Sequence, residues 1–194
     1  MIRGIIFDCF GVLYIDASRY FYEHNVTDYE RLRPELLNLN KAYDYGLLSQ
    51  AELDQAVSEL TGLELSFVSE HIQGMQQRNI ELLKYAQSLR DDHKIGMLSN
   101  IGVGAMDKFF DQKERDQLFD AVVLSGEESI TKPHPHIFEL AAERLGLTPG
   151  ECVMIDDLEE NCSGADAAGM KAILYQSNDQ VKKELAALLE PVDA

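Results

Sequence analysis

A short apolar segment that ends in a carboxylate, close to the start of the chain, constrains the fold most strongly. Residues 5–7 are all apolar, which is typical of a strand buried on both faces of a parallel sheet. Asp8 follows at once, and Gly11 lets the backbone turn away. Ligands of open α/β sheets bind beyond the carboxyl ends of the strands. Asp8 is therefore predicted to lie at a ligand site, although an Asp that only caps a turn would have the same neighbours.

After residue 94 the chain alternates between strand and helix patterns. Apolar strands are predicted over residues 95–98, 121–124, 152–155 and 171–175, and helical patterns separate them. Strands that alternate with helices in this way form a parallel sheet, because each crossover helix returns the chain to the same end of the sheet. The sequence therefore predicts an α/β fold with helices on both faces of a parallel sheet.

Residues 16–85 have a different pattern, in which apolar residues recur at helical spacing without strands between them. Ser49 and Glu52 have the spacing of a capping box at the start of one helix. Pro34 is expected in the first turn of another, where its missing N–H costs least. We therefore expect a helical domain over residues 16–85, inserted into a core domain formed by residues 1–15 and 86–194.

The acidic composition limits the partners of the chain. The 194 residues carry a net charge of −17, which repels nucleic-acid phosphates and anionic membranes. The three cysteines form no disulfide pattern, and neither a signal-peptide layout nor an apolar run of membrane-spanning length is present. We expect a soluble cytoplasmic protein, a monomer or a homodimer, that binds neither nucleic acid nor membrane.

Polar side chains follow three of the predicted strands, and a lysine lies in the loop after a fourth. These residues are Asp8, Ser99, Asn100, Lys132, Asp156 and Asp157. Because parallel strands bring their carboxyl ends to one edge of the sheet, we expect the side chains to lie together. Adjacent buried carboxylates are costly without a cation, and oxygen ligands suit Mg²⁺. The set suits phosphoryl transfer by a carboxylate nucleophile, with a cation, a hydroxyl and an ammonium group near the phosphate.

Four segments, in this order, resemble the motifs of the haloacid dehalogenase-like hydrolases. They are residues 6–13, 97–100, 131–133 with Ile137 and Phe138, and 154–157 with Asn161, Gly164 and Ala165. The resemblance implies a Rossmann-like core and an inserted cap of the four-helix (C1) type. The combination of motifs is most similar to the branch that includes sugar-1-phosphate phosphatases, and to the N-terminal phosphatase domains of epoxide hydrolases.

The resemblance also implies roles for these residues. Asp8 would attack phosphorus and become an aspartyl-phosphate, and Lys132 would orient Asp8 and neutralise charge. Ser99 and the backbone amide of Asn100 would hold phosphate oxygens, and Asn161 would support the metal ligands from behind. The ligands of Mg²⁺ would be Asp8, Asp156, Asp157 and the backbone carbonyl of Phe10. The implied function is Mg²⁺-dependent hydrolysis of a small phosphorylated metabolite, such as a sugar phosphate.

Phe10 departs from the pattern of most phosphatases of this family. They have a second Asp at this position as general acid and base, a role worth roughly 10² to 10⁴ in rate. Dehalogenases of the family have an aromatic residue here and need no metal, but they lack the acidic pair that this chain keeps at Asp156 and Asp157. Two alternatives therefore stay open: a dehalogenase in which Asp8 attacks carbon, and a catalytically weak phosphate-binding or regulatory protein.

Overall fold

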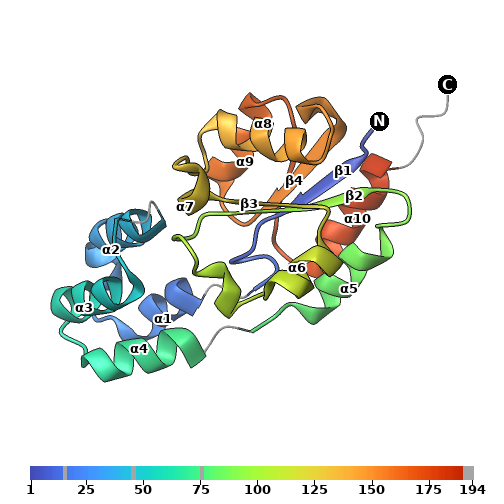
Figure 1. Ribbon diagram of the computed structural model, residues 1–194. Helices are drawn as coiled ribbons and strands as arrows, with labels where there is room; N and C mark the ends of the chain where they lie inside the picture. Colours follow the sequence, from blue (N-terminus) through green and yellow to red (C-terminus); the bar gives the residue numbers. More distant parts are fainter. Residues whose placement is uncertain (15–16, 45–46, 75–76, 190–194) are drawn as a thin grey trace.

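The computed structural model describes residues 1–14, 17–44, 47–74 and 77–189 (Figure 1). Its core is a parallel sheet of five strands in the order β3-β2-β1-β4-β5. The strands are β1 (Gly4–Phe7), β2 (Lys94–Ser99), β3 (Ala121–Leu124), β4 (Cys152–Asp156) and β5 (Lys171–Leu174). All five strands predicted from the sequence are present, and their ends differ from the prediction by at most one residue.

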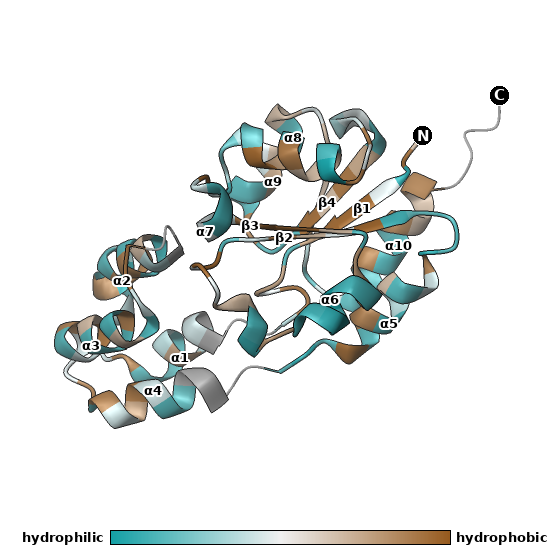
Figure 2. Cartoon of the chain, in the orientation of Figure 1, coloured by the Kyte–Doolittle hydropathy of each residue, from teal (hydrophilic) through white to brown (hydrophobic). Residues whose placement is uncertain are grey.

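Helices cover both faces of the sheet, as the alternating pattern predicts (Figure 1). In β1, Ile5 and Phe7 pack in the core on one face, and Ile6 packs in the core on the other. The first face carries α5 (Ile80–Ser88), α6 (Gln112–Leu118) and α10 (Asn178–Leu189), and the second carries α8 (Pro135–Arg144) and α9 (Glu159–Ala167). Shorter helical segments are η1 (Met106–Lys108), α7 (Ser125–Glu128) and η2 (Pro149–Glu151). Figure 2 shows the apolar strands enclosed between the two helical layers.

The strand register brings the predicted site residues to one place. β1 lies between β2 and β4, and Phe7 pairs with Met97 on one side and with Ile155 on the other. Asp8, one residue further, is therefore level with the end of β4, where Asp156 lies. The strand order reverses direction at β1, and this is the position at which open α/β sheets bind ligands.

The remaining helices form a separate lobe beyond the carboxyl ends of the strands (Figure 1). They are α1 (Ala17–Asn25), α2 (Tyr29–Asp44), α3 (Gln50–Thr61) and α4 (Leu65–Gly74). This lobe has its own hydrophobic core, which includes the buried Phe21, Leu36 and Val57. The predicted capping box at the start of α3 is confirmed, because Ser49 and Glu52 each accept a hydrogen bond from the other's backbone N–H.

Pro34 lies in the second turn of α2, so its expected place in the first turn is wrong. Without an N–H, Pro34 leaves the carbonyl of Glu30 without its usual helical partner. The helix nevertheless continues to Asp44. Leu32 and Leu36, on either side of the proline, are buried in the core of the lobe, and this burial outweighs the lost hydrogen bond.

The helix α5 begins inside the range expected for the inserted domain, yet it packs on the sheet. Leu82, Leu83 and Ala86 belong to the same hydrophobic core as β1. Asn79 caps the start of α5 and also donates a hydrogen bond to the carbonyl of Val12, at 2.9 Å. We propose that the second core segment begins near Asn79 rather than at residue 86.

Among the described helices, none combines the length and hydropathy that crossing a lipid bilayer requires.

Candidate active site

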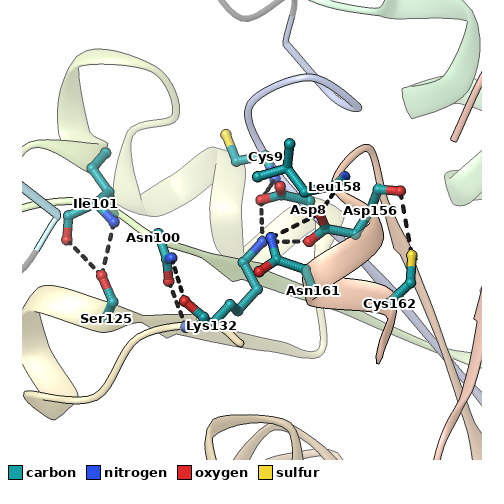
Figure 3. A network of polar contacts seen from close by, with 10 residues as sticks. All are labelled: Asp8, Cys9, Asn100, Ile101, Ser125, Lys132, Asp156, Leu158, Asn161 and Cys162. Carbon is teal, nitrogen blue, oxygen red and sulfur yellow. Dashed lines mark hydrogen bonds and ion pairs between the residues drawn. The ribbon is translucent and has the colours of Figure 1, made fainter. Parts of the chain in front are cut away.

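A buried lysine connects two of the predicted carboxylates (Figure 3). The Nζ atom of Lys132 lies 2.7 Å from Oδ1 of Asp8 and 2.6 Å from Oδ2 of Asp156. The side chains of Lys132, Asp8 and Asp156 are 1%, 8% and 0% exposed. Burial opposes the charge of Lys132, but the two carboxylates outweigh it and raise its pKa above the ordinary value. Lys132 therefore remains an ammonium group.

For Asp8 the surroundings favour the neutral form of the side chain, whereas for Lys132 they favour the charged form. Burial raises the pKa of Asp8 well above the ordinary value; Lys132 lowers it, and Asp156 and Asp157 raise it further. The backbone N–H of Cys9 and the ammonium of Lys132 both donate to Oδ1 of Asp8, at 2.6 and 2.7 Å. No described residue donates to Oδ2. One oxygen of Asp8 is thus fixed, and the other is available to a ligand.

The position of Lys132 is set by the side chain of Asn100. Its Oδ1 accepts a hydrogen bond from the backbone N–H of Lys132 at 2.9 Å, and its Nδ2 donates to the carbonyl of Lys132 at 3.0 Å. The end of β2 therefore holds the loop that carries the lysine. Sequence reasoning assigned only the backbone amide of Asn100 a role, and missed this contact because it joins residues 32 apart in the chain.

The two acidic residues after β4 have different surroundings. Oδ1 of Asp156 accepts hydrogen bonds from the backbone N–H of Leu158 at 3.0 Å and from the amide of Asn161 at 2.8 Å, while Oδ2 accepts from Lys132. Both oxygens of Asp156 are therefore held by protein groups. Asp157 is only partly buried, and its side chain faces the cavity described below. Asp157 is thus the more accessible carboxylate of the pair.

Ser99, the predicted phosphate ligand at the end of β2, is fully buried, and among the described residues its Oγ has no hydrogen-bond partner. In the described part of the chain the cavity wall includes Asn100 and Lys132 but not Ser99. The structure thus brings Asp8, Lys132 and Asn100 to the cavity and leaves Ser99 behind them. Its contact with phosphate stays a prediction.

The carboxylates fit a divalent cation. Asp8, Asp156 and Asp157 each offer an oxygen atom, and these oxygens lie within 4.8 Å of one another. Asp8 and Asp156 share the ammonium group of Lys132, and Asp157 adds a third carboxylate beside them. Carboxylate oxygens suit Mg²⁺. Phe10, whose carbonyl is the fourth predicted ligand, is half-buried at the same cavity.

Gly11 allows the close approach of Asp157. Its φ is +89°, and a Cβ atom at this position would lie 2.4 to 2.6 Å from the carboxylate atoms of Asp157. Both the backbone conformation and the contact therefore require glycine. The turn after Asp8 and the acidic pair after β4 are in this way fitted to each other.

A cavity of about 550 Å³ opens in front of these groups, between the sheet edge and the helical lobe. Asp8, Lys132 and Asp157 lie on its core side, and residues of α2 form part of the opposite wall. Ligand sites for small molecules have volumes of roughly 300 to 1,000 Å³. The cavity is therefore large enough for an organic group attached to a phosphate.

Comparison with known proteins places these features in one family. The model of the haloacid dehalogenase-like hydrolases matches residues 2–169. N-acylneuraminate-9-phosphatase of Homo sapiens is 36% identical over 91 residues, which are 39% of this chain and 37% of that protein. Fructose-1-phosphate phosphatase YqaB of Escherichia coli is 42% identical over 55 residues, 28% of this chain and 29% of that protein. The matched stretches thus cover well under half of these curated relatives.

Solved structures share the whole architecture. A predicted HAD-like family hydrolase from Porphyromonas gingivalis has a TM-score of 0.73 and 27% identity, with 98% of this chain and 100% of that chain covered. A HAD family enzyme from Bacteroides thetaiotaomicron, in complex with magnesium and inorganic phosphate, has a TM-score of 0.69 and 22% identity, with 92% and 96% covered. The predicted fold class, a parallel α/β core with an inserted helical cap, is confirmed.

Proposed function

Because this chain belongs to the haloacid dehalogenase-like hydrolases, we propose that it is a Mg²⁺-dependent phosphatase of a small phosphate monoester. The observation that carries this proposal is the arrangement of Asp8, Lys132 and Asp157 at the cavity, where carboxylate oxygens of Asp8, Asp156 and Asp157 lie close enough together to hold a divalent cation. The names of the two curated relatives, which act on a phosphorylated sugar acid and a phosphorylated sugar, support the same substrate class.

In the proposed reaction, Oδ2 of Asp8 attacks phosphorus while the bond from phosphorus to the leaving oxygen breaks. Water then attacks phosphorus, releases inorganic phosphate and restores the carboxylate of Asp8. Lys132 holds Oδ1 and keeps the nucleophile oriented. The ligands of Mg²⁺ would be Asp8, Asp156, Asp157 and the carbonyl of Phe10. The oxygens of Asp156 also accept hydrogen bonds from Lys132 and Asn161. When bound, Mg²⁺ supplies positive charge to the transferring phosphoryl group.

The proposal is tested by release of inorganic phosphate from a panel of phosphorylated metabolites. We expect turnover with Mg²⁺ and none in excess chelator, because the carboxylates alone would repel the phosphate. Turnover that persists in chelator would overturn the metal role. Phe10 favours a second candidate, a dehalogenase, and release of halide from a 2-haloacid without metal would support it instead.

The contact between Gly11 and Asp157 gives a prediction about Mg²⁺. In Gly11→Ala, the new methyl group displaces the carboxylate of Asp157, so we expect Mg²⁺ to bind about 10- to 100-fold more weakly. The measurement is thermal stabilisation by Mg²⁺ over a range of concentrations. Gly62→Ala is the matched control, because Gly62 has a φ of +74° but nothing within 4 Å of its Cβ position. An equal loss of Mg²⁺ affinity in both variants would contradict the proposed role of Asp157.

Phe10 gives a prediction about the leaving group. Its ring packs against Phe109, with ring centres 4.8 Å apart, and offers no proton at the position of the usual acid. The rate should therefore depend steeply on leaving-group acidity, so that aryl and anomeric phosphates react well and alkyl phosphates poorly. Phe10→Asp should raise the rate with poor leaving groups by up to roughly 10²-fold. Phe10→Asn should not raise it, because Asn has the size of Asp but no acidic proton.

The measurement is kcat/KM across a series of phosphate monoesters of graded leaving-group acidity. Beyond Asp8 and Asp157, the acidic side chain that lines the described cavity wall is Glu160. We therefore include Glu160→Gln and expect its series to have the same slope as the wild type. A flat series for the wild type that becomes steep in Glu160→Gln would show that Glu160 supplies the proton, and our account of Phe10 would be wrong.

A further inference from the structure

The cap side of the cavity carries two basic residues. Arg33, Leu37 and Lys41 are spaced four residues apart in α2, which places them on one face of the helix. All three line the cavity, opposite the core side that holds Asp8 and Lys132. On this wall Leu37 lies between the two cations, and the other lining residues of α2 are uncharged: Tyr29, Pro34, Asn38, Asn40 and Tyr43.

This positive wall stands out from the charge of the lobe around it. Residues 17–74 contain ten acidic and four basic side chains. Two of the four basic side chains, Arg33 and Lys41, line the cavity, and none of the acidic side chains described in the lobe does so. Glu30 and Glu35 belong to the same helix as Arg33 and lie outside the wall. Within an acidic lobe, the face toward the cavity is selectively basic.

Arg33 and Lys41 are also not used by the fold. Neither forms an ion pair or a hydrogen bond with any residue that the structure describes, whereas Arg78 pairs with Glu114 and Arg144 pairs with Glu128. Lys132, the cation on the core side, is already held by Asp8 and Asp156. The two cations of α2 are therefore available to a ligand.

We propose that Arg33 and Lys41 recognise a second anionic group of the substrate, a carboxylate or a further phosphate on the leaving-group side. This inference rests on the proposed function, which assigns the core side of the cavity to the phosphate that is hydrolysed. Eight residues of helix separate the two cations by about 12 Å along the axis, and their long flexible stems let either one, or both, reach the second anion. An otherwise strongly acidic protein would in this way select a substrate that carries negative charge at both ends.

The test compares three phenyl phosphates that differ only in the para substituent: a carboxylate, its neutral carboxamide analogue, and a second phosphate. Thermal stabilisation in Mg²⁺ measures binding, with Asp8→Asn introduced so that the probes are not consumed, and phosphate release by proteins that keep Asp8 gives kcat/KM. We expect the wild type to bind the charged probes about tenfold more tightly than the carboxamide. The preference should decrease as salt is raised, because exposed charges are screened.

Variants identify the residues responsible. We expect the preference for charge to be reduced in Arg33→Gln and in Lys41→Gln and to be lost in the double variant, with partial retention in Arg33→Lys. Arg31→Gln is the matched control, because Arg31 lies in the same helix, is exposed and does not line the cavity. A preference shown only by the bisphosphate would assign the second anion as phosphate.

Two results would overturn the inference. One is equal binding of the carboxamide and both charged probes by the wild type, and the other is a preference that persists in the double variant. If the preference behaves as expected but no probe is hydrolysed, the proposed function fails and the anion site stands. If the probes are hydrolysed without any preference for charge, the proposed function stands and the anion site fails.

Discussion

Asp8→Asn should abolish turnover without loss of the fold. The amide cannot attack phosphorus, and loss of a nucleophile in enzymes of this kind costs at least about 10³-fold in rate. The side-chain oxygen of Asn can still accept the hydrogen bond from the backbone of Cys9. Because burial raises the pKa of Asp8 well above its ordinary value, ionisation of Asp8 costs more in the folded protein than in the unfolded chain, and its removal should leave the melting temperature unchanged or higher.

The measurements are phosphate release and thermal unfolding of the same preparations. Glu159→Gln is the control, because Glu159 is an exposed acid at the start of α9 that does not line the cavity. This control should keep full activity. If Asp8→Asn retained more than a few per cent of the wild-type rate, the covalent mechanism would be wrong. If it unfolded, Asp8 would be a structural residue.

Lys132→Met should have the largest effect on stability. The substitution leaves Asp8 and Asp156 buried without their cation, and breaking a buried ion pair in this way costs about 3 to 5 kcal/mol. Lys132 lowers the pKa of Asp8, so its removal raises that pKa further. The folded variant then binds more protons than the unfolded chain, and its stability falls as pH rises and recovers as pH is lowered.

Urea unfolding at acidic and at neutral pH measures this effect. Lys84→Met, at an exposed position of α5, is the control and should lose little stability at either pH. We also expect Mg²⁺ to restore part of the stability of Lys132→Met, since the ion opposes the same charges. A deficit that is independent of pH would contradict the electrostatic explanation and indicate a loss of packing instead.

The strand ends were the part of the molecule that the sequence predicted well. A continuous apolar run such as residues 5–7 can only be buried, and the residue after it must then lie at the edge of the sheet. The pairing of Phe7 with Ile155 places Asp8 beside Asp156 at the end of β4, and Lys132 contacts both carboxylates. Order along the chain was sufficient here because parallel strands share one direction.

Features that depend on packing between distant segments were not predictable from the sequence. Three features depend on contacts that no local pattern relates. They are the contact of Asn100 with Lys132, the continuation of α2 past Pro34, and the packing of α5 on the sheet. The same holds for Arg33 and Lys41, which look like solvated residues of a helix until α2 is seen as a wall of the cavity. Local periodicity determines which face of a helix is buried but not what its other face meets.

The central claim is that Asp8 carries the phosphoryl group during turnover. The most direct measurement is a rapid acid quench of the wild type with para-nitrophenyl phosphate and Mg²⁺, followed by mass spectrometry of the peptide that contains Asp8. We predict a phosphoryl group on Asp8 that hydroxylamine removes and that is missing both in Asp8→Asn and in excess chelator. Steady release of phosphate by an enzyme whose Asp8 peptide is never modified would contradict this account.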